Sequence, residues 1–151
     1  MKIYIGADHN GYSLKAKLSK YLVRAGYDIE DEGDENYQAD DDFPQFASRV
    51  VMSVLGSSDD DPRGILICGS GQGMCMAANR FNRIYAALAW SQKSAREART
   101  DDNSNVLCLP ARLLSETPEK ANLIVETWLT TPFTGATRFR RRLKQMDELR
   151  P

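Results

Sequence analysis

The chain has 151 residues, with 20 basic and 21 acidic side chains and a formal net charge of −1 at pH 7. A chain of this length forms one ordinary domain that buries roughly two-thirds of its unfolded surface. The balanced charge offers no overall attraction for nucleic acid. No signal sequence precedes the first predicted strand, and no apolar run approaches a membrane span. We therefore expect neither a nucleic-acid partner nor a membrane.

The cysteines and the acidic runs carry no metal pattern. Cys68, Cys75 and Cys108 are an odd number without a C-x-x-C spacing, which argues against a disulfide framework and a zinc site. The aspartate runs 40–42 and 59–61 are most simply solvated loops, and the first precedes a proline that suits the first turn of a helix. We expect no metal, no cofactor and a reducing cytoplasmic location.

Strand and helix patterns alternate along the whole chain. Short apolar runs predict strands at 2–7, 27–31, 64–68, 84–89 and 105–109. Segments with helical periodicity and helix boundaries predict helices at about 11–25, 46–56, 74–80, 91–99, after 115, and at about 136–149. Strands separated by helices pair in parallel through right-handed crossovers. The predicted fold is a single three-layer α/β/α sandwich, spanning 1–151, with a five-stranded parallel Rossmann-like sheet.

The segment Gly64–Arg80, GILICGSGQGMCMAANR, combines a buried strand, Cys68, a glycine-rich turn and a helix. This order places backbone N–H groups and a helix N-terminus around a small volume that suits a phosphate or an oxyanion. The glycine spacing matches neither the dinucleotide fingerprint nor a P-loop. A ligand-free turn with a buried structural cysteine is the alternative interpretation.

A second polar cluster follows the first strand, in the segment MKIYIGADHNGY. In parallel sheets, ligands bind beyond the carboxyl ends of the strands, so Asp8 and His9 should lie at the same sheet edge as Cys68 and Ser70. Taken alone, Asp8 could cap a helix and His9 could be structural. Two polar clusters at one edge favour an active site.

The segments GADHNGY and ICGSGQGM-x-x-AANR, together with Asn105-Val106-Leu107, resemble the ribose-5-phosphate isomerase B / galactose-6-phosphate isomerase family. The similarity extends from Lys2 to about Leu143. It implies a sheet in the order 2-1-3-5-4 and aldose–ketose isomerisation of a sugar phosphate through a cis-enediolate.

Such a reaction needs a base, donors to an oxyanion and a proton carrier between O1 and O2. Cys68 is similar to the family's thiolate base, and Met74 stands where some relatives have a glutamate base. The remaining candidates are Ser70 as the proton carrier, Asp8 and His9 as substrate-binding groups, and the backbone N–H groups of Gly69, Gly71 and Gly73 as oxyanion donors.

The last predicted helix is rich in arginine. Arg138 and Arg142 are four residues apart, so they share one helix face and could hold a phosphate with forked donors. A solvated basic face is the alternative, and nucleic-acid binding is disfavoured by the balanced charge. The resemblance matches both residues, and Arg112, to phosphate-binding arginines. It also implies that helix 136–149 completes a neighbouring subunit's site, in a homodimer or tetramer.

One segment departs from the family pattern. Where most members have His-Asn, this chain has Asp101-Asp102, and the histidine is assigned to opening the sugar's furanose ring. Asp101 thus becomes the candidate ring-opening residue and Asp102 a substrate-binding one. Ribose 5-phosphate and ribulose 5-phosphate are the first expectation for the substrate. The alternatives are a tetrose-phosphate (erythrose/erythrulose 4-phosphate) or hexose-phosphate isomerase, or a non-catalytic sugar-phosphate-binding partner subunit.

Overall fold

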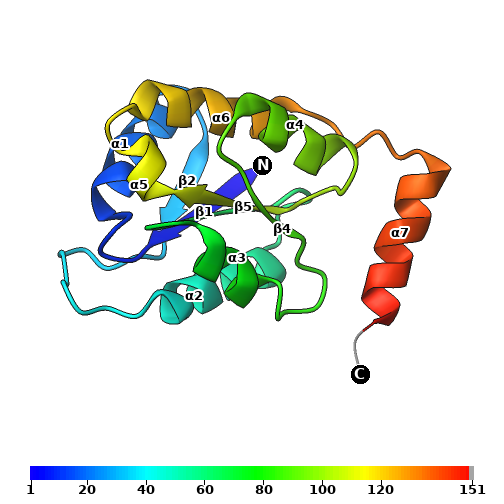
Figure 1. The fold of residues 1–151 in the computed structure, drawn as a ribbon, viewed down its shortest axis with the longest axis horizontal. Coiled ribbons are helices and arrows are strands. Elements are labelled where there is room, and N and C mark those ends of the chain that lie inside the picture. Colours follow the sequence, from blue (N-terminus) through cyan, green and yellow to red (C-terminus); the bar gives the residue numbers. More distant parts are fainter. Residues whose placement is uncertain (150–151) are drawn as a thin grey trace.

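The computed structural model describes residues 1–149, and within them five parallel strands form one sheet in the order β2-β1-β3-β5-β4 (Figure 1). The strands are β1 (Lys2–Ala7), β2 (Asp28–Asp31), β3 (Arg63–Cys68), β4 (Ala86–Leu88) and β5 (Val106–Pro110). The helices are α1 (Tyr12–Arg24), α2 (Phe43–Gly56), α3 (Gln72–Ala78), α4 (Gln92–Thr100), α5 (Ala111–Leu114), α6 (Pro118–Thr130) and α7 (Thr137–Glu148). The predicted α/β class and strand order are confirmed. Residues 150 and 151 of the predicted domain lie outside the described residues.

Helices cover both faces of the sheet, which confirms the three layers (Figure 1). Along β3, Ile65 and Ile67 pack with α1 and α6 on one face, while Leu66 and Cys68 pack with α2 and α3 on the other. This alternation follows from the two-residue period of a strand. Every residue of β3 is buried, as expected for a central parallel strand.

The edge strand β4 is shorter than the predicted strand 84–89, and side-chain hydrogen bonds explain where it begins. The backbone N–H of Tyr85 donates to Oδ1 of Asn105 at 2.9 Å, so this residue pairs with a side chain. Regular pairing with β5 starts at the next residue, Ala86. The amide of Asn79 bonds both backbone groups of Ala86, at 2.9 Å each, and satisfies them at the edge of the sheet. The short helix α5 was not predicted.

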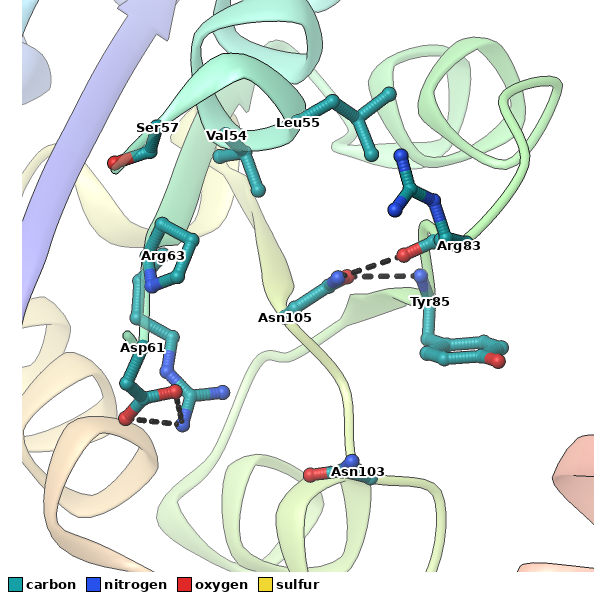
Figure 2. A pocket seen from close by; sticks show the side chains of 10 residues that line it. Val54, Leu55, Ser57, Asp61, Arg63, Arg83, Tyr85, Asn103 and Asn105 are labelled. Atoms are coloured by element: carbon teal, nitrogen blue, oxygen red, sulfur yellow. Dashed lines mark hydrogen bonds and ion pairs between the residues drawn. The ribbon is translucent and has the colours of Figure 1, made fainter. Parts of the chain in front are cut away.

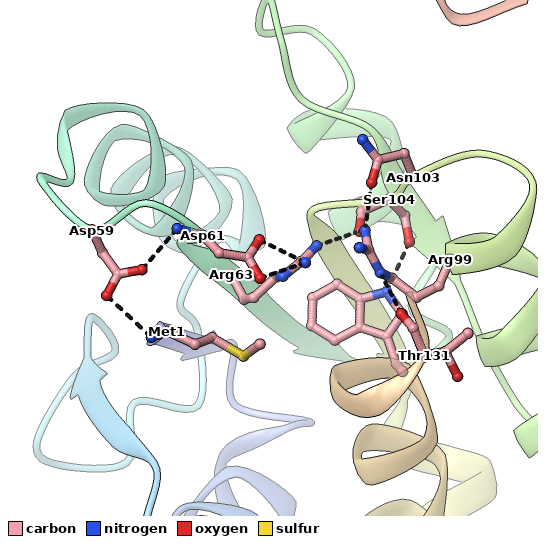
Figure 3. Close-up of polar contacts among 9 residues, drawn as sticks. Met1, Asp59, Asp61, Arg63, Arg99, Asn103, Ser104 and Thr131 are labelled. Atoms are coloured by element: carbon pink, nitrogen blue, oxygen red, sulfur yellow. Dashed lines mark hydrogen bonds and ion pairs between the residues drawn. The ribbon is translucent and has the colours of Figure 1, made fainter. Parts of the chain in front are cut away.

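Two arginines are buried where the loop before β5 meets β3 and α6 (Figure 3). Both Arg63 and Arg99 donate to the backbone oxygen of Ser104, whose hydroxyl accepts from Nε1 of Trp128 at 2.8 Å. The guanidinium of Arg63 pairs with Asp61 and lies 5.6 Å from the centre of the Trp128 ring. Burial, with the nearby charge of Arg63, lowers the pKa of Arg99 to about 10. Arg99 therefore stays cationic at neutral pH and helps to fix the loop.

Trp128 is fully buried, and Trp128→Ala is expected to lower the free energy of unfolding by about 3–5 kcal/mol, because it leaves a large cavity and unpairs the Ser104 hydroxyl. Urea unfolding followed by circular dichroism measures this change. The chain's other tryptophan, Trp90, is 52% exposed and is the control: Trp90→Ala should change stability by less than ~0.5 kcal/mol. Equal losses in the two variants would contradict this account of the core.

Helix α7 stands apart from the layered body, beyond β4 in Figure 1. Of its residues only Phe139 is buried. The guanidinium groups of Arg138 and Arg142 lie 4.5 and 5.8 Å from the centre of the Phe139 ring. Near the end of the helix, the Tyr85 hydroxyl donates to the carboxylate of Asp147. The helix therefore presents most of its basic surface to solvent in the single chain.

Candidate active site

The carboxyl ends of β1, β3 and β5 surround a cavity of about 330 Å³. The strand register pairs Ala7 with Ile67 and Cys68 with Pro110, so the residues that follow these strands meet at one level. The backbone N–H of Asp8 also donates to the carbonyl of Ile67 at 3.2 Å. The cavity is lined by Asp8, His9, Asn10, Asp41, Asp42, Phe43, Cys68, Gly69, Ser70, Gly73 and Arg112.

Cys68 lies at the end of β3 with 5% of its surface exposed. Its Sγ accepts a hydrogen bond from the backbone N–H of Gly71 at 3.2 Å. Gly71 has φ +75°, and a Cβ there would collide with the side chain of Leu88. This position therefore requires glycine, and the turn it allows brings a backbone donor to the sulfur. Gly71 itself does not line the cavity.

The other two glycines of the turn allow side chains to approach the backbone closely. A Cβ at Gly69 would lie 3.0 Å from Cζ of Arg112, and one at Gly73 would lie 2.8 Å from Cζ of Phe43. The backbone N–H of Arg112 donates to the carbonyl of Gly69 at 3.0 Å, which holds α5 against the turn. Within residues 1–149 the Arg112 guanidinium has no hydrogen-bond or ion-pair partner, so its donors are available to an anion in the cavity.

Asp8 and His9 enter the cavity from the end of β1, and Asp41 enters from the loop before α2. Oδ1 of Asp8 accepts the backbone N–H of Gly11 at 3.1 Å and so caps the turn that leads into α1. Nδ1 of His9 lies 2.7 Å from Oδ1 of Asp41. The hydrogen bond to Asp41, followed by the charge of Asp8, raises the pKa of His9, against an opposing effect of partial burial.

The prediction that residues 40–42 form a solvated loop was wrong for Asp41, whose side chain is only 7% exposed. Its contact with His9 spans 32 positions in the chain, so no local pattern could identify it. Phe43, which stands between the first aspartate run and the proline, is likewise absent from the predicted site residues. The structure places its ring against Gly73 at the cavity.

Asp101 and Asp102 do not line the cavity. They follow α4 and precede β5, at the amino ends of the strands, whereas Cys68 lies at the carboxyl end of β3. Val106 and Pro110 are four positions apart along β5, which alone separates the two edges by about 13 Å. Asp101 accepts a hydrogen bond from the Thr100 hydroxyl at 2.8 Å. Neither carboxylate reaches the Cys68 cavity of its own chain.

Asp102 and the predicted phosphate clamp of α7 lie on a common side of the molecule. Burial and then the negative charge of Asp101 raise the pKa of Asp102, while the positive charge of Arg142 opposes them. Arg138 and Arg142 are likewise absent from the lining of the Cys68 cavity. Seven of the twelve predicted site residues therefore line one cavity. Gly71 does not line it, but its backbone N–H donates to Sγ of Cys68. The other four lie elsewhere in the same chain.

A second cavity of similar size, about 330 Å³, opens at the amino ends of the strands (Figure 2). Most of its polar side chains are already engaged with the protein. The Asn105 amide bonds the carbonyl of Arg83 and the backbone N–H of Tyr85, and Arg63 bonds Asp61 and the Ser104 carbonyl. These groups hold the chain together, so the cavity at the carboxyl ends is the better candidate for catalysis.

Within residues 1–149, no three His, Cys, Asp or Glu side chains come together in an arrangement that could hold a metal ion. Over the same residues, no helix is both long enough and apolar enough to cross a bilayer.

Comparisons with known proteins identify the family of this chain. The model of the ribose/galactose isomerase family matches residues 3–146. Probable ribose-5-phosphate isomerase B of Mycoplasma genitalium is 42% identical over 139 residues, which cover 92% of this chain and 90% of the relative.

Two solved structures have the same fold. Ribose 5-phosphate isomerase from Thermotoga maritima has a TM-score of 0.91 and 43% identity, over 98% of each chain. The Mycoplasma genitalium enzyme, with bound ribulose 5-phosphate, has a TM-score of 0.91 and 40% identity, over 97% of this chain and 94% of the other. The chain belongs to the ribose/galactose isomerase family.

Proposed function

We propose that this chain interconverts ribose 5-phosphate and ribulose 5-phosphate in the cavity at the carboxyl ends of its strands. The observation that carries the proposal is the placement of a thiol that can act as a base, Cys68, and an unpaired guanidinium, Arg112, in the same cavity. The name of the Mycoplasma genitalium relative, and its structure with ribulose 5-phosphate, support this choice of substrate.

In the proposed reaction, the Cys68 thiolate removes the proton from C2 of the open-chain aldose and returns it to C1. The electron pair of the broken C–H bond forms the C1–C2 double bond of the enediolate, and the negative charge moves to oxygen. Backbone N–H groups of the glycine turn stabilise that charge. The exposed Ser70 hydroxyl lies on the cavity wall, where it can carry a proton between O2 and O1.

The same cavity has separate groups for the two ends of the substrate. Arg112 donates to the phosphate with its planar, forked guanidinium. Asp8 uses Oδ1 to accept the Gly11 N–H, and its second oxygen can accept from a sugar hydroxyl. His9 lies beside Asp8 and completes the polar wall.

We also propose that a second copy of the chain completes this site, in a homodimer or a tetramer. Asp101, Asp102, Arg138 and Arg142 lie outside the Cys68 cavity of their own chain, and α7 extends away from the body (Figure 1). A twofold arrangement would carry the α7 of one copy to the cavity of the other. The chain is then a single isomerase domain whose basic helix serves its neighbour. The unpaired cysteines and the phosphorylated substrate suit a reducing cytoplasm.

The assay that tests the proposal uses the purified chain alone, with ribose 5-phosphate, erythrose 4-phosphate and a hexose 6-phosphate. The proposed function requires turnover of ribose 5-phosphate with the highest kcat/KM of the three. A higher kcat/KM for the tetrose or the hexose would show that the chain isomerises that sugar phosphate instead. The absence of turnover with all three, despite phosphosugar binding, would support a partner subunit without catalytic activity.

Asp101→His is expected to raise kcat for ribose 5-phosphate by about tenfold, because ring opening precedes proton transfer for this sugar. A carboxylate accepts a proton poorly and has none to give at neutral pH, whereas imidazole can do both. The tetrose phosphate cannot close a furanose ring, so its kcat should not change and serves as the internal control. An equal change for both sugars, or none for ribose 5-phosphate, would show that Asp101 has no part in ring opening.

A further inference from the structure

The chain has a single histidine, His9, and its ring is held from a distant segment. Asp41 comes from the loop before α2 and has a nearly buried side chain, while the His9 side chain is 30% exposed. Oδ1 of Asp41 accepts the backbone N–H of His9 at 2.9 Å and lies 2.7 Å from Nδ1. One carboxylate oxygen therefore fixes both the backbone and the ring of His9.

This contact determines which ring nitrogen carries a proton. An ionised carboxylate only accepts hydrogen bonds, so the proton of the neutral imidazole must be on Nδ1. The other nitrogen, Nε2, lies 2.8 Å from Nδ2 of Asn10, an exposed side chain at the cavity. Nε2 therefore accepts from Asn10 when His9 is neutral, and becomes a donor when His9 is protonated.

We propose that Asp41 is a positioning residue for the isomerase: it fixes the orientation and tautomer of His9, so that protonated His9 donates from Nε2 to an oxygen of the bound sugar phosphate. This inference rests on the proposed function for its substrate. The substrate can replace Asn10 at Nε2, because the Asn10 side chain is exposed and has no other partner among residues 1–149.

The charges around His9 favour its protonated form. The hydrogen bond to Asp41, and next the charge of Asp8, raise the pKa of His9, and partial burial opposes them. The other charged or titratable groups that line the cavity are Asp42, Cys68 and Arg112. Of these, only the arginine is a fixed cation, and the carboxylates outnumber it. The imidazole is therefore held as a cation to higher pH than a free histidine.

The protonation of His9 sets the pH dependence of substrate binding. A protonated His9 donates to substrate below its pKa, and this donor is lost as the pH rises through that pKa. Asp41→Asn removes the negative charge but keeps an oxygen that can accept from Nδ1–H. It should therefore move the His9 titration, and the rise in KM, to lower pH. Asp41→Ala removes the acceptor as well, and should raise KM across the whole pH range.

Nuclear magnetic resonance tests whether Asp41 controls the titration of His9. No substrate is needed, because the single histidine gives one imidazole titration. Asp40→Asn is the matched control: it removes the same charge one residue away, from an exposed side chain that does not line the cavity. We expect a titration at lower pH in Asp41→Asn and no change in Asp40→Asn. An unchanged titration in Asp41→Asn would overturn the inference, whether or not the chain is an isomerase.

Enzyme kinetics tests whether protonated His9 donates to the bound sugar phosphate. At a pH above the His9 pKa of the variant and below that of the wild type, Asp41→Asn should raise KM for ribose 5-phosphate by about tenfold, the effect of losing one charge-assisted hydrogen bond. The value of kcat should change less than twofold. At a pH below both values KM should return to that of the wild type. A loss confined to kcat would contradict the positioning role, and thermal unfolding identifies any variant that has merely lost its fold.

Discussion

Replacement of Cys68 by alanine is expected to lower kcat by about two to four orders of magnitude, the range for the loss of a positioned base. The sulfur ends a fully buried strand and accepts the Gly71 N–H, so alanine removes the base with little change in the surrounding backbone. Met74, at the position where some relatives carry a glutamate, is completely buried in the core and does not line the cavity. No second base in the turn can compensate.

Cys75→Ala is the matched control for this variant. Cys75 lies in α3, and its Sγ is directed to the carbonyl of Ala86 at 3.2 Å, away from the residues that line the cavity. Its kcat should stay within about twofold of the wild type, as for a substitution that leaves the reacting groups in place. Near-normal turnover in Cys68→Ala, or equal losses in the two variants, would show that another group moves the proton.

The second large effect is expected from the arginines of α7. Arg138→Ala or Arg142→Ala should raise KM for ribose 5-phosphate by about 10- to 100-fold, since each removes charge-assisted hydrogen bonds to the phosphate. Arg141→Ala is the control, because that side chain is exposed on the same helix but was not matched to the clamp. Similar KM values in all three variants would reduce α7 to a solvated basic surface.

Mixing variants tests whether the clamp acts between copies. An Arg138→Ala chain retains the base, and a Cys68→Ala chain retains the arginine, so a mixed dimer has one complete site. Random exchange of subunits in a dimer should therefore restore about a quarter of the wild-type activity. Mixtures as inactive as their parents, with subunit exchange demonstrated by mass spectrometry, would place the whole site within one chain.

The positions of Cys68 and Asp8 could be predicted because Cys68 ends one recognisable strand and Asp8 follows another. Parallel pairing aligns the carboxyl ends of all strands at one edge, so assigning the strands was enough to bring the two residues together. The strand register then sets them at one level. The strands could be assigned from the sequence because the central parallel strands are continuously apolar.

The remaining parts of the site depend on contacts that sequence spacing does not encode. Asp41 lies in a loop and contacts His9, whereas its neighbours in the acidic run are exposed. The composition of the run therefore predicted only a solvent-exposed loop. The same limit applies to Asp101 and Arg138. Their residue types suit the chemistry, yet both lie outside the Cys68 cavity of their own chain. They could contribute to such a cavity only in an assembly of two copies.

The most direct test of the central claim follows the proton itself. Ribose 5-phosphate is incubated with the enzyme in deuterium oxide, and nuclear magnetic resonance records deuterium at C1 of ribulose 5-phosphate and at C2 of ribose 5-phosphate. Incorporation is expected at similar rates with the wild type and with Cys75→Ala, and at a rate about two to four orders of magnitude lower with Cys68→Ala. Incorporation by Cys68→Ala at the wild-type rate would contradict the claim that Cys68 transfers the proton.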